Sequence, residues 1–371
     1  MNSHFLKTAV IRFTSAVREE MTPVSSNFLT LDFLRFLSSL IIIVFHYKEE
    51  IATERLHELA HRLLSHGHLF VDLFFVISGF IISYVYWGKI SSKAQYGKFM
   101  IKRIARLWPL HILLLLAYLG IWGATTLADI PLRNPDKYDV SCIVPHALML
   151  HAMGTCDKLA FNYVSWSISA EMGMYVLTPL FFMIAVRSIR YLAFIALIIS
   201  CTLIYVTWDG QSYLHENVTF GLARAIPSFV IGICLFLSRS RLNYIPIPNF
   251  LLFVTLILFF ILSIFTPELS DYILIFLIYG IAIFAISADM RGAVPTPIKR
   301  LAPLGNLTYG SYMLHPIIST VIFAFVAQHI LGLTGIANDL TILLMIPLSF
   351  IAAVFSLVLI ETPCRRLFSN R

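Results

Sequence analysis

Two residues capable of chemistry, Arg35 and His46, lie in the apolar stretch LDFLRFLSSLIIIVFHY. In a helix, eleven positions at about 100° each end about 20° beyond three turns, so both side chains share one face, about 16 Å apart along the axis. Asp32 lies one turn before Arg35 and can pair with it. A neutral imidazole can accept a proton near physiological pH, so His46 is a candidate general base. Alternatively, neither residue is catalytic: the Arg35 side chain extends to the cytoplasmic membrane surface, and His46 lies at the outer membrane surface.

A basic cluster opens the later segment FMIKRIARLWPLH, which contains Lys102, Arg103 and Arg106. Arg103 and Arg106 are three positions apart, so they can point the same way on a helix. Guanidinium groups bind phosphates through paired hydrogen bonds and stay charged, which favours a site for an anionic cofactor. Simple anchoring of a helix at the cytoplasmic surface would also explain these cations.

Two further segments place ionisable side chains in apolar surroundings. Glu171 lies in the first turns of YVSWSISAEMGMY, where an acid suits the positive end of a helix. It could instead partner His46. His315 follows Tyr309 and Tyr312 in TYGSYMLHPI, and we expect a buried, hydrogen-bonded histidine there.

The segment GHLFVDLFFVISGFII carries Asp72 near one end and the pair Ser78-Gly79 in its middle. Small residues in a membrane helix favour close approach by a second helix. The alternative is a gap through which a thin ligand passes.

The composition indicates a membrane protein. Of 371 residues, 58% are hydrophobic and 13% are charged, whereas a soluble domain averages about 45–50% apolar and about 25% charged residues. The net charge of +7 comes from basic residues between apolar runs, a pattern of membrane topology rather than of nucleic-acid binding. The sequence has no zinc-binding spacing, and we expect no metal.

The apolar runs predict an all-α polytopic membrane protein with about ten transmembrane helices. Lys and Arg concentrate in alternate connections, which favours cytoplasmic N and C termini. Residues 1–28 are expected to form a cytoplasmic N-terminal segment. The predicted spans are 31–48, 68–87, 104–126, 169–186, 191–208, 219–238, 250–266, 272–288, 306–330 and 340–361.

Cys142 and Cys156 share one long polar connection. If this connection faces an oxidising compartment, the two cysteines can form a disulfide. The alternative, two free thiols, is equally compatible with the sequence.

Several segments together resemble the integral-membrane acyltransferase-three family, which includes O-antigen and exopolysaccharide O-acetyltransferases. They occur in the family's order and extend over about residues 29–367, the expected membrane acyltransferase domain. The most specific are the Arg-x10-His of the first span and the Arg-x-x-Arg before the third. The segments are LDFLRFLSSLIIIVFHY, GHLFVDLFFVISGFII, KRIARLWPLH, SWSISAEMGMY, TYGSYMLHP and ETPCRRL.

The resemblance implies acyl transfer from cytoplasmic acyl-CoA, usually acetyl-CoA, to a sugar hydroxyl on the outer side of a bacterial inner membrane. The family's essential histidine corresponds to His46 and its paired arginine to Arg35. The donor-binding pair corresponds to Arg103 and Arg106, with Lys102 as a further candidate. The expected partners are the lipid bilayer, a carbohydrate acceptor and proteins of surface-polysaccharide biosynthesis, without nucleic acid.

The chain departs from the family pattern at two positions. Family members often have two consecutive acids in the fourth-span motif, whereas Met172 follows Glu171 here, and Phe33 replaces a common glycine. A scheme that needs two carboxylates is therefore weakened. The soluble hydrolase-like domain found after the membrane domain in some relatives is also expected to be absent.

These observations lead to a mechanistic hypothesis with two rivals. His46 would act as general base, or would carry the acyl group covalently. Arg35 would stabilise the donor, and Glu171 would orient the imidazole. The rivals are a secondary transporter and a non-catalytic partner in a surface-polysaccharide assembly. Inverted repeats would favour transport, and none is recognisable in the sequence.

Overall fold

The computed structural model describes residues 13–21, 28–130, 132, 134–207, 212–266 and 269–369. The chain is helical through most of these residues, and the described part contains no strand, as the sequence predicts. Residues 13–21 form a helix. The rest of the expected cytoplasmic segment 1–28, apart from Phe28, lies outside the described residues.

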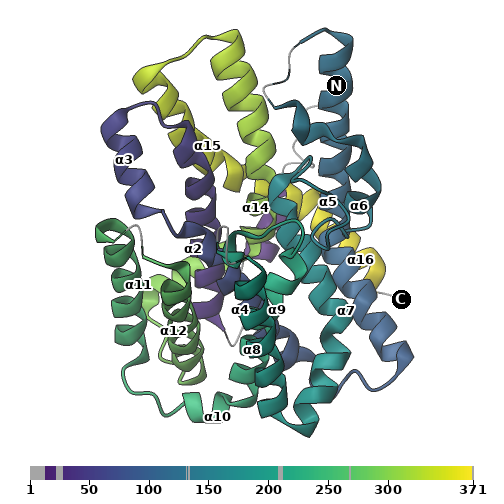
Figure 1. Cartoon of the computed structure of the whole chain (residues 1–371), viewed down its shortest axis with the longest axis vertical. Helices are drawn as coiled ribbons and strands as arrows, with labels where there is room; N and C mark the ends of the chain where they lie inside the picture. Colours follow the sequence, from purple (N-terminus) through teal and green to yellow (C-terminus); the bar gives the residue numbers. More distant parts are fainter. Residues whose placement is uncertain are drawn as a thin grey trace.

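The helices follow one another as a single bundle (Figure 1). The α-helices are α2 (Leu29–Tyr47), α3 (Glu54–Leu63), α4 (Phe70–Tyr86), α5 (Lys93–Leu127), α6 (Ile143–Ala147), α7 (Trp166–Arg187), α8 (Ile189–Val206), α9 (Gly221–Leu237), α10 (Arg239–Leu242), α11 (Pro248–Phe265), α12 (Asp271–Met290), α13 (Thr296–Leu301), α14 (Thr308–Ile318), α15 (Gly335–Ser356) and α16 (Thr362–Ser369). The short or irregular turns are η1 (Lys48–Glu50), η2 (Gly67–Leu69), η3 (Pro135–Tyr138), η4 (Val140–Cys142), η5 (Tyr163–Ser165), η6 (Tyr213–His215) and η7 (Ala302–Leu307), with π-helical η8 (Ser319–Ile330) and η9 (Leu357–Glu361).

Ten apolar helices correspond to the ten predicted spans. Nine of those described are long and apolar enough to cross a bilayer, and the shorter Gly221–Leu237 helix, α9, is the tenth. The prediction of an all-α polytopic membrane protein is therefore confirmed. The main difference is length, because α5 is one helix of 35 residues that begins well before the predicted third span.

The first transmembrane helix, α2, lies in the interior of the bundle, near the centre of Figure 1. It contacts α4, α12 and α14. The buried residues of α2 include Leu31, Leu34 and Ile42, each at most 1% exposed. This central position explains how the polar residues of α2 avoid lipid, because the surrounding helices cover them.

Helices α4 and α9 pack together through glycines. A β-carbon on Gly79 would overlap the backbone of Phe229, and one on Gly232 would overlap the backbone of Val76. The close-approach interpretation of Ser78-Gly79 therefore holds for Gly79.

A buried ion pair joins the same two helices near one end. The guanidinium of Arg224 donates to Asp72 at 3.0 Å, and both side chains are at most 1% exposed. The ring of Trp166 lies 4.6 Å from the guanidinium carbon of Arg224. Removing one member would leave an unpaired buried charge, which costs about 3–5 kcal/mol.

The connection between α5 and α7 folds against α5. Cys142 and Cys156 form a disulfide with Cα atoms 5.5 Å apart, which decides between the two alternatives left open by the sequence. Both cysteines pack with Tyr118 of α5 and with Phe161. The connection is therefore held by covalent and apolar contacts.

Candidate active site

A cavity opens where α2, α4, α5, α7 and α14 meet, and its open space is about 950 Å³. One wall is apolar, formed mainly by α4. The polar and tyrosine side chains in the lining are Asp32, Arg35, Ser78, Arg103, Arg106, Ser167, Glu171, Tyr175, Thr308, Tyr309 and Tyr312.

Three guanidinium groups and two carboxylates face this one space. Arg35 lies 3.6 Å from Asp32, one turn away on α2, and its side chain is 22% exposed. Arg106 and Glu171 line the same cavity as Arg35. Arg35 was predicted from one motif, and Arg103 and Arg106 were predicted from another. The structure brings all three to one cavity from two helices that are distant in sequence.

Aromatic rings position Arg103. Its guanidinium donates to the Tyr86 hydroxyl at 3.2 Å and lies 5.5 Å from the Tyr86 ring centre and 5.7 Å from that of Tyr175. Its buried Nε makes no hydrogen bond within the described part of the chain. An aromatic cradle limits the rotation of this long side chain and leaves a donor available for a ligand.

Glu171 also belongs to the cavity. Its carboxylate accepts hydrogen bonds from Ser78 at 2.9 Å and from the hydroxyl of Tyr175 one turn later. These contacts fix the carboxylate on the side of the arginines. The alternative contact of Glu171 with His46 is not made within the described residues, where the rings nearest to His46 belong to Phe45, Tyr163 and His315.

His46 lies at the far end of α2, and neither His46 nor Lys102 is among the described residues that line the cavity. The half-buried imidazole of His46 packs against the rings of Tyr163 and His315, with centroids 5.0 and 5.4 Å away. It therefore faces protein on α14 and η5. Lys102 is exposed on α5.

Tyr312 connects the cavity with the histidines. Its hydroxyl contacts Ser167 at 2.8 Å, and both residues line the cavity. Its ring lies 5.9 Å from that of His315, which packs on His46. A chain of polar and aromatic side chains thus leads from the arginines toward His46.

His315 is fully buried, as expected, but neither of its ring nitrogens has a hydrogen-bond partner within the part of the chain that the structure describes. The Tyr47 hydroxyl instead donates to the backbone carbonyl of His315 at 2.9 Å. The buried imidazole of His315, with two nitrogens that can still form hydrogen bonds, lies beside His46 and is a candidate functional residue. The sequence predicts only a structural role for it.

Sequence reasoning also missed the tyrosines of the cavity. Tyr309, Tyr312 and His315 recur every three positions, a signal of one helix face that was visible in TYGSYMLHP. Tyr175 was equally visible, four positions after Glu171. Ser78 was noted only for its small size, whereas its hydroxyl orients Glu171.

The fold and the cavity define a multi-pass membrane protein with a charged interior site. A family model described as "Acyltransferase domain", that of the acyltransferase-three family, matches residues 28–361. The chain belongs to this family and is a membrane acyltransferase. Searches of curated proteins and of solved structures found no match.

Proposed function

We propose that this membrane acyltransferase moves an acyl group, acetyl in the simplest case, from cytoplasmic acyl-CoA to a hydroxyl of an exported or cell-surface carbohydrate. The observation that best supports this proposal is the cavity shared by Arg35, Arg103 and Arg106. Tyr312 and His315 lie between this cavity and His46. The bacterial inner membrane and partners in surface-polysaccharide biosynthesis are part of the proposal.

The donor binds through its phosphates. Arg103 and Arg106 present guanidinium groups from one face of α5, and Arg106 makes no hydrogen bond or ion pair within the described residues. Such groups bind phosphate oxygens in pairs. Lys102 is exposed and does not line the cavity, so it would contact the donor only at the entrance of the cavity. The apolar wall formed by α4 suits the uncharged arm of the donor.

The transfer step needs a base near the thioester. In this proposal His46 removes the proton of the acceptor hydroxyl, and the oxygen forms a bond with the thioester carbonyl carbon. The carbon–sulfur bond breaks, and the imidazolium returns the proton to the leaving sulfur. Arg35 stabilises the donor, and Glu171, held by Ser78 and Tyr175, keeps the arginines in place. His315 positions the His46 ring.

A transfer assay in membranes tests this proposal. Membranes from a deletion strain carrying the gene on a plasmid receive acyl-CoA labelled in the acyl group, and surface glycans are analysed by mass spectrometry. We expect label in the glycan and an acyl mass increment that is absent without the gene. Transport of the intact donor without transfer would favour the transporter, and acylation unchanged in the deletion strain would favour a non-catalytic partner.

A further inference from the structure

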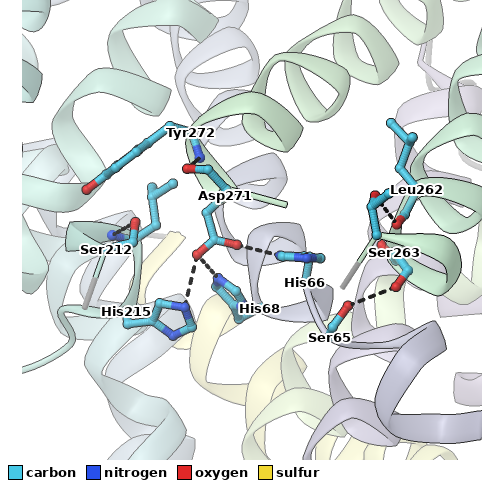
Figure 2. Close-up of polar contacts among 12 residues, drawn as sticks. Ser65, His66, His68, Ser212, His215, Leu262, Ser263, Asp271 and Tyr272 are labelled. Carbon is cyan, nitrogen blue, oxygen red and sulfur yellow. Dashed lines mark hydrogen bonds and ion pairs between the residues drawn. The ribbon is translucent and has the colours of Figure 1, made fainter. Parts of the chain in front are cut away.

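Three segments that are distant in sequence bring a carboxylate and three imidazoles together. His66 and His68 precede α4, His215 ends η6, and Asp271 begins α12. Figure 2 shows all three rings directed at the Asp271 carboxylate. His66 Nδ1 lies 2.6 Å from Oδ1, whereas His68 Nε2 and His215 Nε2 lie 3.2 and 2.9 Å from Oδ2.

We propose that His68, His215 and Asp271 bind a divalent cation of the zinc class, a site outside the acyl-transfer cavity. The ligand atoms, one from each residue, all lie within 4.8 Å of one another. Zinc bonds of about 2.0–2.1 Å in tetrahedral geometry place neighbouring ligand atoms about 3.3 Å apart. The measured 2.9 and 3.2 Å are close to that spacing.

The charges around the site suit a cation. Asp271 supplies one negative charge in a side chain that is only 5% exposed. The nearby Arg224 is neutralised by its ion pair with Asp72. His66 forms a hydrogen bond with Oδ1 of Asp271, the carboxylate oxygen that does not face His68 and His215. Metal-binding carboxylates are commonly oriented by such a hydrogen bond from a residue that does not itself bind the metal.

The site also has room for a further ligand. The His215 side chain is 40% exposed, so water can reach the ion from that side. A second group, His111, His146 and His151, is fully buried and has no carboxylate. Its rings are parallel within 8°, so their in-plane lone pairs do not meet at one point. The Asp271 group is therefore the better metal site.

A bound ion would tie together the start of α4, the connection before α9 and the start of α12. None of the four residues lines the cavity. The ring of His68 packs on Phe45, the neighbour of His46 in sequence, with centroids 5.9 Å apart. Because none of these residues lines the cavity, we expect the ion to stabilise this end of the bundle, with water in its open position.

Metal content of the purified full-length protein tests the site. The protein is solubilised in detergent and purified on a tag without histidine, then equilibrated with Zn²⁺ and dialysed. We expect about one zinc per chain by mass spectrometry, tetrahedral absorption bands with Co²⁺, and a lower Tm after chelation. His215→Ala and Asp271→Asn should each lower Zn²⁺ affinity at least tenfold and abolish the effect of the chelator. His66→Asn should weaken binding about 10–100-fold.

His61→Ala is the matched control, because His61 is partly exposed on α3 outside the group. This variant should keep the zinc and the chelator response. A wild-type protein without zinc, without the Co²⁺ spectrum and with a Tm unchanged by chelation would show a hydrogen-bonded cluster only and overturn the proposal. Zinc retained by both His215→Ala and Asp271→Asn would do the same. None of these measurements uses acyl transfer, so they stand apart from the proposed function.

Discussion

His46 lies half-buried between the rings of Tyr163 and His315, at the opposite end of α2 from the arginine cavity. An imidazole packed edge-on and face-on in this way has few orientations available. In the proposed reaction, the acyl group rather than the phosphates of the donor would reach His46, because His46 does not line the arginine-containing cavity. Under this proposal, the orientation of the His46 ring relative to the thioester depends on Tyr163 and His315.

His46→Ala should lower the rate of acyl transfer by about 10²–10⁴-fold, the usual contribution of a general base. The rate is measured with labelled acyl-CoA in membranes, at equal protein levels. His329→Ala, at an exposed histidine on η8, is the control and should retain the wild-type rate. Wild-type transfer by His46→Ala would remove this residue from the mechanism.

Arg103→Ala combined with Arg106→Ala should raise the KM for acyl-CoA by at least about tenfold. Each lost hydrogen bond to a charged group costs about 1.5–3 kcal/mol. Lys102→Ala, which removes an exposed neighbour, should change KM much less. An unchanged KM in the double variant would mean that the donor phosphates bind elsewhere.

At the scale of elements, α4 performs two tasks with adjacent residues. Gly79 lets α9 approach closely, while Ser78 turns its hydroxyl toward Glu171 in the cavity. One helix thus carries part of the packing on one face and part of the site on another. Disturbing the α4–α9 contact should therefore affect both stability and activity.

Gly79→Ala should destabilise the protein by about 1–3 kcal/mol, because the new β-carbon would overlap the Phe229 backbone. Thermal unfolding in detergent, followed by tryptophan fluorescence, measures the change. Gly120→Ala on α5 is the matched control, since no atom lies within 4 Å of its added β-carbon. Equal Tm values for the two variants would contradict the packing argument.

The connection after α5 should be sensitive to acid. Burial, followed by the charges of neighbouring histidines, lowers the pKa of His146 to about 2 and that of His151 to about 3. In the unfolded chain both pKa values return to about 6.5. Unfolding therefore takes up protons below about pH 6.5, and stability falls as the pH drops toward 4, by about 1.4 kcal/mol per pH unit for each histidine.

The Tm of the wild type should consequently fall between about pH 6.5 and pH 4, and His146→Gln should make this fall shallower. His329→Gln, at an exposed position, serves as the control with the wild-type slope. A pH dependence identical in His146→Gln and the wild type would exclude His146 as a cause.

For the whole molecule, the disulfide bears on membrane orientation. A disulfide in the connection after α5 suits an oxidising compartment. Among the residues that the structure describes, three apolar helices precede this connection and seven follow it, counting α9. Both numbers are odd, so both chain ends would lie on the side opposite to the disulfide, in agreement with the distribution of Lys and Arg.

A fluorescent protein fused after the last residue should therefore fold and fluoresce, whereas a periplasmic phosphatase fused there should be inactive. The same two reporters fused to a chain truncated at Asp136, within the connection after α5, should give the reverse result. Phosphatase activity at the C terminus would show the opposite orientation.

Much of this architecture could be predicted from the sequence, because apolar length alone identifies a membrane span. Arg35, Arg103 and Arg106 could be identified from their motifs, whereas Glu171 was considered a partner of His46 and lies in the cavity with the arginines instead. The pairing of His46 with His315, and the hydroxyls around Glu171, depend on how separate helices pack, which no local pattern encodes. The Asp271 group was missed for the same reason, since its members come from three separate connections.

The 35-residue length of α5 has a consequence for the lipid environment. Such a helix is about 52 Å long, and the hydrocarbon core of a bilayer measures about 30 Å. The basic first part of α5, which contains Lys93, Lys98, Lys102 and Arg103, can protrude from the hydrocarbon, and the tilt of the apolar remainder varies with bilayer thickness. Arg103 lies ten residues from its start, so hydrophobic mismatch would set how deep this cation sits. We expect reconstitution into thin and thick bilayers to alter the access of a water-soluble nucleotide to the cavity.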